Sequence, residues 1–294
     1  MFDQLRAFHR PATIAAALRL FEAERRLGGR GRFVAGGTDL VVQGDRSLRY
    51  LVDLSRLPLR YVKKRGGGWA VGATSTMTDL EHARALRHFA DGILAEAAGT
   101  AGSRQIRNMG TAGGNLANAS PACDLAPPLL ALDASVVIAG KGVRRTVPLD
   151  RFFRGVHRTA LNGGLLVEIV IPALPKAPRG RAAWSFQKVG RLQSDIAVVN
   201  AAAGIVLDQH GSCAWARIAL GAVAPTPLRA RRAEALLVGH AFDRAAIEAA
   251  ATRAAQEAKP VSDVRASADY RREMSRVLVA RALSECLERM GRAR

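Results

Sequence analysis

The chain has 294 residues, enough for two or three domains, and its 49% apolar and 23% charged content is ordinary for a globular protein. The net charge of +19 raises the question of a nucleic acid, an anionic membrane or an acidic protein as partner. The arginines are spread along the whole chain without interleaved aromatic residues, which favours compositional bias plus an acidic partner over nucleic-acid binding.

Cysteine and histidine usage predicts no metal site on this chain. Cys123, Cys213 and Cys286 lie far apart and form no C-x-x-C pair, and the six histidines show no ligand spacing. An odd, sparse cysteine count is typical of a reducing compartment. No run approaches 18 apolar residues, and the first residues lack the basic start of a signal peptide. We therefore expect a cytoplasmic protein without a membrane span.

The first 54 residues predict a small α/β unit. Apolar spacing over 14–21 indicates one face of a helix, which the glycine pair at 28–29 ends. Short strands are expected at 32–35 and 51–54, whereas the run 40–43 is too short to assign.

The central third predicts strands interrupted by helices. Thr78 and Glu81 have the spacing of a capping box, so one or two helices should follow, from Leu80 to about Gln105. Asp124 precedes a run whose prolines suit a first helical turn, which makes it a candidate N-cap. Strands are expected at 60–63, 69–73, 136–139, 143–147 and 165–172.

The last third is separable from the rest, because Pro175, Pro178 and Gly180 indicate a domain boundary. Three strands are expected at 183–189, 198–207 and 214–223, followed by helices at 228–238, 243–259 and 268–290. The predicted domains are residues 1–56, 57–178 and 179–294.

Two glycine-paired loops carry the chemistry that can be predicted. They are Val34 to Leu40 and Arg107 to Leu116. Glycine permits positive φ and close approach of the backbone to a ligand, and successive N–H groups in such turns can bind anionic oxygens. No Gly-Lys-Ser/Thr follows either pair and neither reads G-x-G-x-x-G, so a Walker loop and a Rossmann site are disfavoured.

Two matched loops on separate α/β units favour a ligand that has two phosphates held between them, such as a pyrophosphate-bearing dinucleotide. Thr38 and Thr111 would add hydroxyl donors, and Asn115 would add an amide. Asp124 is an acceptor only when ionised, so it suits a sugar hydroxyl or a helix N-terminus better than a phosphate.

Both loops, together with the run Pro121 to Asp124, resemble the FAD-binding (medium) subunit of molybdenum hydroxylases, the xanthine dehydrogenase and carbon monoxide dehydrogenase flavoprotein family. The resemblance continues in family order through the rest of the chain. The further matching segments are 159–161, 165–172, Lys188, 195–200, 221–227 and 263–272.

The resemblance implies an α+β protein: a vanillyl-alcohol-oxidase/PCMH-type FAD-binding fold in two α/β subdomains, followed by a C-terminal α+β domain with a three-stranded sheet and helices. It implies a subunit without a substrate-oxidising site of its own. A molybdopterin-binding large subunit would oxidise the substrate, and a small subunit would carry two [2Fe–2S] clusters. The FAD subunit would pass electrons to NAD⁺, a quinone or oxygen, in a heterotrimer that often dimerises.

The resemblance also implies roles for individual residues. The two loops would enclose the pyrophosphate, Asp124 would bind the adenosine or ribityl part, and Lys188 would lie near the flavin. Leu166 matches a position that packs on a cofactor ring, and a plain core leucine is the alternative. We assign no catalytic residue and no metal ligand to the chain. The expected cofactor-binding residues are Val34, Ala35, Gly36, Gly37, Thr38, Asp39, Leu40, Thr111, Gly113, Gly114, Asn115, Asp124, Leu166 and Lys188.

Two alternative functions stay open. A stand-alone flavin reductase or oxidase, such as UDP-N-acetylenolpyruvoylglucosamine reductase, would share the fold and would be active when purified alone. A nucleic-acid-binding protein would be colourless, with an affinity for DNA that depends steeply on salt. The substrate of the holoenzyme and its final acceptor are not fixed by this chain.

Overall fold

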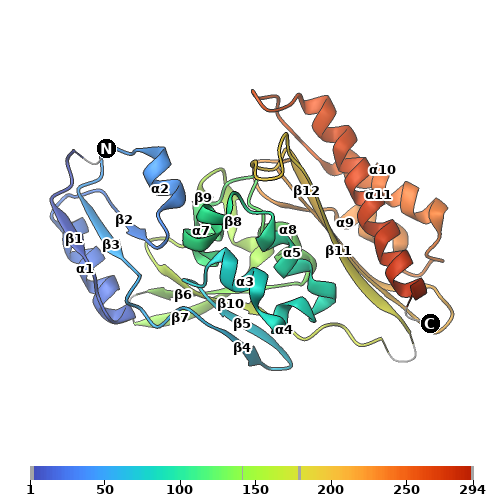
Figure 1. Cartoon of the computed structure of the whole chain (residues 1–294), viewed down its shortest axis with the longest axis horizontal. Coiled ribbons are helices and arrows are strands. Elements are labelled where there is room, and N and C mark those ends of the chain that lie inside the picture. Colours follow the sequence, from blue (N-terminus) through green and yellow to red (C-terminus); the bar gives the residue numbers. More distant parts are fainter. Residues whose placement is uncertain (1–2, 141, 178–179, 293–294) are drawn as a thin grey trace.

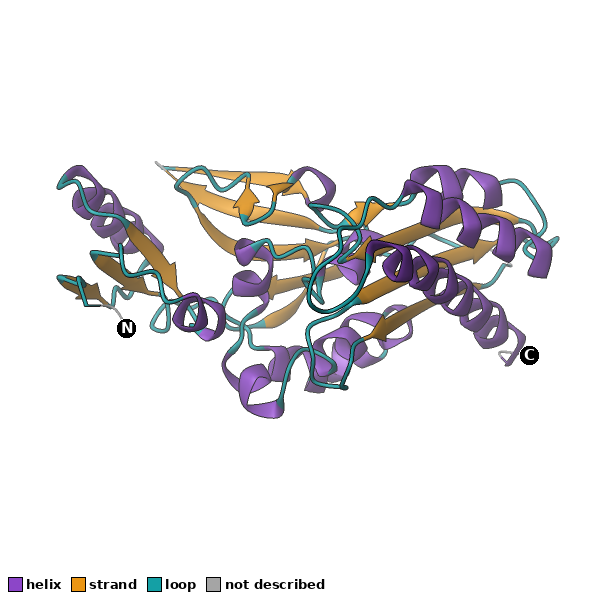
Figure 2. Ribbon diagram, turned by 90° about the horizontal axis from the view of Figure 1, so that it is seen from above, coloured by secondary structure: helices purple, strands orange, loops and turns teal. Residues whose placement is uncertain are grey.

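Three larger β-sheets follow one another along the molecule, with helices between and beside them (Figure 1). The computed structural model describes residues 3–140, 142–177 and 180–292. The amino-terminal sheet and the carboxy-terminal helices lie at opposite ends (Figures 1 and 2). Among the described residues, no helix combines the length and the apolar character that crossing a membrane requires. The cytoplasmic location stays a prediction.

The amino-terminal unit is a parallel sheet of order β1-β3-β2 with a helix packed on it. The side chain of Thr13 caps α1, and Phe21 of α1 stacks on Phe33 and meets the edge of Tyr50. The expected helix and both strands are confirmed, and the unassigned run forms the short helix α2. The elements are β1 (Ala7–His9), α1 (Ile14–Arg26), β2 (Gly31–Val34), α2 (Thr38–Gln43) and β3 (Tyr50–Asp53).

The central sheet is antiparallel, in the order β4-β5-β10-β6-β7. Its expected strands are all present; the sequence also predicts a turn about Lys141 and Gly142 between the strands at 136–139 and 143–147, and Lys141 lies outside the described residues. The elements are β4 (Val62–Arg65), β5 (Gly68–Gly72), β6 (Ser135–Gly140), β7 (Val143–Pro148), η2 (Leu149–Arg151), the ribbon β8 (Phe153–Gly155) with β9 (Arg158–Thr159), and β10 (Leu165–Ile171).

The first helix of the central unit has its cap two residues earlier than predicted. Thr76, not Thr78, is this cap, and Asp79, not Glu81, completes the capping box. Thr78 instead donates to Asn108, so it joins two helices. The elements are α3 (Met77–His82), α4 (Arg84–Arg87), η1 (Ala90–Gly92), α5 (Ile93–Gly99), α6 (Arg104–Met109), α7 (Ala112–Asn118) and α8 (Ala126–Ala131).

The carboxy-terminal unit is an antiparallel sheet of order β11-β12-β13-β14 covered by helices on one face. The predicted helix at 228–238 begins only at Arg231, because Leu228 and Arg229 pair with β13 and add a fourth strand. The elements are β11 (Ala182–Val189), β12 (Val199–Leu207), β13 (Cys213–Gly221), β14 (Leu228–Arg229), α9 (Arg231–Leu237), α10 (Arg244–Glu257) and α11 (Ala268–Arg292).

The buried side chains form layers that fix these units against each other. The central helices are packed between the central sheet and the face of the last sheet that bears Trp184 and Phe186. The opposite face of the last sheet packs on α9, α10 and α11. The amino-terminal unit packs on the outer face of the central sheet through Val137 and Leu165. The exact domain boundaries stay a prediction.

Candidate functional site

The two glycine loops touch each other. The first leaves the end of β2, and the second joins α6 to α7. A Cβ atom on Gly36 would overlap the carbonyl oxygen of Met109, so only glycine lets the two loops approach this closely. Gly110 lies opposite Thr38, whose hydroxyl oxygen would be 3.5 Å from a Cβ added there. The structure thus brings together both motifs that the sequence singled out.

The first loop leaves backbone donors free. Gly37 adopts φ +70 as the N-cap of α2, and it has no side chain that could cap the helix. The first N–H groups of a helix have no partner within the helix. Among the described residues, no acceptor takes the N–H groups of Thr38, Asp39 or Leu40. This loop can therefore donate several hydrogen bonds to an anion.

The second loop uses most of its backbone donors within the protein. The N–H of Ala112 donates to Ser75 at 2.8 Å, that of Gly113 to Ala73 at 2.9 Å, and that of Gly114 to the Thr111 hydroxyl at 3.1 Å. The N–H of Thr111 has no acceptor among the described residues, so the expectation of free backbone N–H groups in the second loop is wrong for Ala112, Gly113 and Gly114. This loop can offer a ligand the N–H and the hydroxyl proton of Thr111 and the side-chain amide of Asn115.

Asn115 is oriented by the segment that follows. Its Oδ1 accepts from the Cys123 thiol at 2.8 Å and from the Leu125 N–H at 3.3 Å. Burial raises the pKa of the Cys123 thiol, so this thiol stays protonated and can donate. Because Oδ1 is used in this way, the NH₂ group of Asn115 is the part left to donate to a ligand.

Asp124 and Lys188 form a buried pair next to this segment. The two side chains meet at 3.0 Å and are 11% and 7% exposed, so Lys188 is not a solvated strand-end lysine. Lys188 also donates to the Thr100 carbonyl at 2.8 Å, and Asn200 donates to Asp124 at 3.4 Å. Burial raises the pKa of Asp124, and Lys188 and then Asn200 oppose that shift.

The N-cap role predicted for Asp124 is wrong. Helix α8 begins at Ala126 with Leu125 as its N-cap, and no side chain caps it. The carboxylate is directed to the last sheet instead, because Lys188 on β11 and its register partner Asn200 on β12 supply a cation and an amide there.

Leu166 lies on β10 and is 4% exposed. Its side chain belongs to the core between the central sheet and the central helices, with Leu116 of α7 in the same cluster. The plain core role therefore accounts for its burial, and a contact with a cofactor ring stays a prediction.

A polar bridge closes the other side of the two loops. Gln43 at the end of α2 donates to the Asn118 side chain at 2.9 Å, and His157 meets the Asn118 carbonyl at 2.8 Å. Desolvation raises the pKa of the Asp39 carboxyl, and the interaction with His157 opposes that shift. The first loop is thus tied to the second at both ends.

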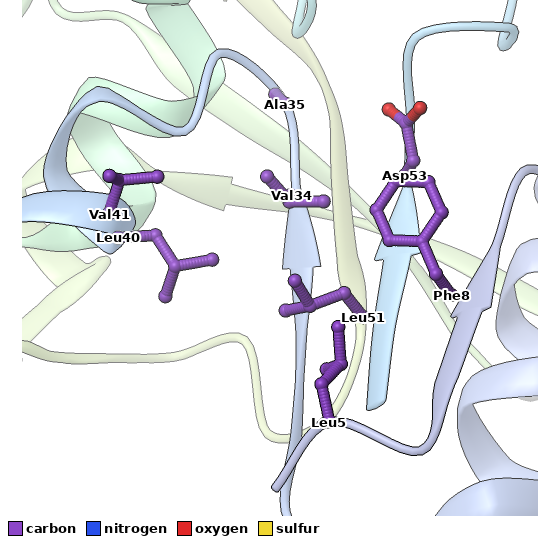
Figure 3. A pocket seen from close by; sticks show the side chains of 8 residues that line it. All are labelled: Leu5, Phe8, Val34, Ala35, Leu40, Val41, Leu51 and Asp53. Atoms are coloured by element: carbon purple, nitrogen blue, oxygen red, sulfur yellow. The ribbon is translucent and has the colours of Figure 1, made fainter. Parts of the chain in front are cut away.

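An apolar pocket of about 360 Å³ adjoins the first loop on the face of the amino-terminal sheet (Figure 3). Its aliphatic and aromatic walls come from β1, β2, α2 and β3. Asp53 lies at its rim and is already bonded by Arg10 and Ser55. The pocket can accept a flat apolar ring. Its lining residues are Leu5, Phe8, Val34, Ala35, Leu40, Val41, Leu51 and Asp53.

The sequence predicted no role for Thr100, which accepts a hydrogen bond from Lys188, or for Asn200, which donates one to Asp124. Thr100 contributes a backbone carbonyl at the end of α5, which no side-chain pattern indicates. Asn200 stands in an apolar strand with 0% exposure, and a buried amide in such a run is the signal that could have found it. In the described part of the chain, no group of three His, Cys, Asp or Glu side chains could hold a metal ion.

Free backbone donors and an adjoining apolar pocket are features that suit a ligand with phosphates and a ring. Two family models match the chain. Residues 2–174 match the FAD binding domain in molybdopterin dehydrogenase, and residues 184–286 match the CO dehydrogenase flavoprotein C-terminal domain. The chain belongs to this family of FAD-binding subunits of molybdenum hydroxylases.

Several relatives match over nearly their whole length. The chain is 34% identical to the carbon monoxide dehydrogenase medium chain of Hydrogenophaga pseudoflava, over 94% of this chain and 95% of that one. It is 32% identical to the xanthine dehydrogenase FAD-binding subunit of Escherichia coli O157:H7, over 99% of each chain. A chain of the Hydrogenophaga pseudoflava carbon monoxide dehydrogenase structure superposes with a TM-score of 0.90 at 33% identity, covering 99% of this chain and 100% of that chain. The predicted α+β fold class is confirmed.

Proposed function

We propose that this chain carries FAD between its two loops and transfers electrons from the [2Fe–2S] clusters of a partner subunit to an external acceptor. The observation that carries the proposal is the set of free N–H groups at Thr38 to Leu40, in the loop that touches the second loop at Gly36 and Met109. A diphosphate is the anion that such donors suit, and the family is an FAD-binding one.

The residues present fit FAD. The first loop would bind the diphosphate through its backbone, and Thr111 and Asn115 would bind it through their side chains. The apolar pocket beside Val34 and Leu40 would take the adenine, since the Asp124–Lys188 pair lies at the other side of the second loop. Asp124 would accept from a hydroxyl of the cofactor.

Lys188 would stabilise negative charge on the ring system. Bound FAD supplies the storage of two electrons, and a fixed cation beside the ring favours its electron-rich form. Two partners hold the ammonium group in place, the Thr100 carbonyl and the Asp124 carboxylate. Replacement of Lys188 by Met should lower the midpoint potential by about 30 mV, which corresponds to about 1.4 kcal/mol for a two-electron couple. An unchanged potential would remove Lys188 from this role.

The proposed partners are a molybdopterin-binding large subunit and a [2Fe–2S] small subunit, assembled as a dimer of heterotrimers. Similarity to a medium chain and to an FAD-binding subunit supports this arrangement. The acceptor would be NAD⁺, a quinone or oxygen. The surplus of basic residues would partly face acidic surfaces of these partners, and binding indifferent to salt would count against that role.

Titration of the purified chain with FAD and with FMN tests the cofactor assignment. We expect one FAD per chain, with FMN at least about 100-fold weaker, because FMN lacks the diphosphate and the adenine that the first loop and its pocket would bind. No FAD binding after reconstitution would overturn the proposal. Purification of the native complex should yield molybdenum and iron with the flavin, whereas an active lone flavoprotein would support a stand-alone reductase.

A further inference from the structure

A buried arginine bonds the backbone of segments that lead to the Asp124–Lys188 pair. Arg271, in the first turns of α11, is 2% exposed. Its guanidinium donates to the Val198 carbonyl at 2.6 Å and to the Ala222 carbonyl at 3.2 Å, and it pairs with Asp263 at 2.7 Å. A buried charge is costly unless such partners surround it. Its Nε has no partner among the described residues.

The two carbonyls mark the ends of neighbouring strands. Val198 immediately precedes β12, and Ala222 immediately follows β13. Ala222 adopts φ +63, which is unfavourable for a residue with a Cβ atom, so the surrounding contacts must hold it there. One guanidinium nitrogen bonds both carbonyls and therefore fixes the two strand ends relative to each other.

Each strand end leads directly to the candidate site. The N–H of Ala222 donates to the Pro121 carbonyl at 2.7 Å, three residues before Asp124. Two residues after Val198, the side chain of Asn200 donates to Asp124. Asn200 is also the register partner of Lys188. A small cluster of Ala122, Ala197 and Ala222 packs between these segments.

We propose that Arg271 is a positioning residue for the cofactor site. It touches none of Asp124, Lys188 and Asn200 in the described contacts, yet it holds the backbone on which each of them depends. Its cation can bond two carbonyls and a carboxylate at once, because the guanidinium has several N–H donors in one plane. A lysine has its three donors on one nitrogen, whereas Arg271 uses two nitrogens, one for both carbonyls and the other for Asp263, so a lysine cannot reproduce this arrangement. The inference rests on the proposed function, because its main readout is FAD binding.

The test compares Arg271→Lys with Arg229→Lys. Arg229 is a buried arginine of the same sheet, 7% exposed, whose partners are Asp133 and Glu234, and none of its bonds reaches the Asp124 segment. Both variants should melt at lower temperature than the wild type. Measured well below both melting temperatures, only Arg271→Lys should raise the Kd of FAD, by tenfold or more, and shift the flavin midpoint potential. Equal Kd and potential in the two variants would overturn the proposal.

A second variant covers the case in which Arg271→Lys does not fold. Asp263→Asn keeps the arginine and its two carbonyl bonds but removes the carboxylate, which is on a loop. The Kd of FAD should rise about threefold, and a Kd equal to that of the wild type would contradict the inference. If the wild-type chain itself fails to bind FAD, the proposed function fails; if the wild type binds and the variants do not differ, only the role of Arg271 is lost.

Discussion

The two glycine loops look alike in sequence and serve opposite purposes in the structure. In the first, Gly36 permits a contact with the second loop, and the following N–H groups remain free. In the second, a Cβ at Gly113 would lie 2.6 Å from the Ala73 carbonyl oxygen, so glycine there lets α7 pack on the end of β5. A glycine pair thus indicates close approach of the backbone without saying whether a ligand or the protein itself approaches.

The largest expected effect comes from the contact between the loops. Gly36→Ala would force its Cβ into the Met109 carbonyl, a backbone atom that cannot rotate away. We expect the free energy of unfolding to fall by about 1–3 kcal/mol and FAD binding to be lost. Gly44→Ala is the control, because that glycine has φ +59 and no neighbour closer than 3.9 Å. It should cost about 1 kcal/mol through backbone strain and keep the cofactor. Equal effects on FAD binding would contradict this account.

Asn115→Asp separates the structural role of the Asn115 oxygen, which accepts hydrogen bonds within the protein, from the proposed role of its NH₂ group as a donor to FAD. The aspartate keeps an acceptor for Cys123 and Leu125 but replaces the NH₂ donor with a negative charge. Stability should change little, and the Kd of FAD should rise about 100-fold through the lost donor and repulsion of the diphosphate. Asn118→Asp, at the last residue of α7, is the matched control and should leave the Kd within a few-fold. Isothermal titration calorimetry measures the Kd of FAD for both variants. An unaltered Kd in Asn115→Asp would rule out the donor role.

A smaller change is expected from the cap of α7. Thr111→Val removes the hydroxyl that accepts from Gly114, at a cost of about 1 kcal/mol in unfolding free energy. Thr111→Ser retains the hydroxyl and should behave like the wild type within about 0.5 kcal/mol. Denaturant unfolding of the chain without cofactor measures both. If Val and Ser were equally stable, the hydroxyl would not be the cap of this helix.

The smallest effect concerns pH. Folding raises the pKa of Asp39, so the fold favours the protonated carboxyl, and this contribution is lost as the pH rises through the folded-state pKa. Asp39→Asn should therefore melt slightly above the wild type near pH 7 and at the same temperature near pH 3. Thermal melts without cofactor at both pH values are the measurement. A lower melting temperature of the variant near pH 7 would show that His157 outweighs the desolvation.

Periodicity and turn residues predicted most of the fold. The helix at 14–21, the strands flanking the first loop and the strands of the two antiparallel sheets follow from local patterns. The short strand β14 could not be predicted, because only its pairing with β13 makes Leu228 and Arg229 extended. The capping box was displaced by two residues, since Thr76 and Thr78 offer the same side chain and tertiary packing selects between them.

The site was predictable in its motifs and not in its hydrogen bonds. Gly36 and Asn115 could be singled out because their residue types match a phosphate-binding loop. Nothing local shows that Ala73 and Ser75, some forty residues before Gly113, take the N–H groups of the second loop. The Asp124–Lys188 pair is likewise a long-range contact, and it replaced the local N-cap role that the sequence favoured.

Amide hydrogen exchange with and without FAD tests the division of roles between the loops most directly. Without cofactor, the amides of Ala112 to Gly114 should already be protected by their bonds to Ser75, Ala73 and Thr111, and FAD should change them little. The amides of Thr38 to Leu40 should exchange quickly without FAD and slow at least about tenfold when it binds. Strong new protection at 112–114 with none at 38–40 would contradict the assignment of the diphosphate to the first loop.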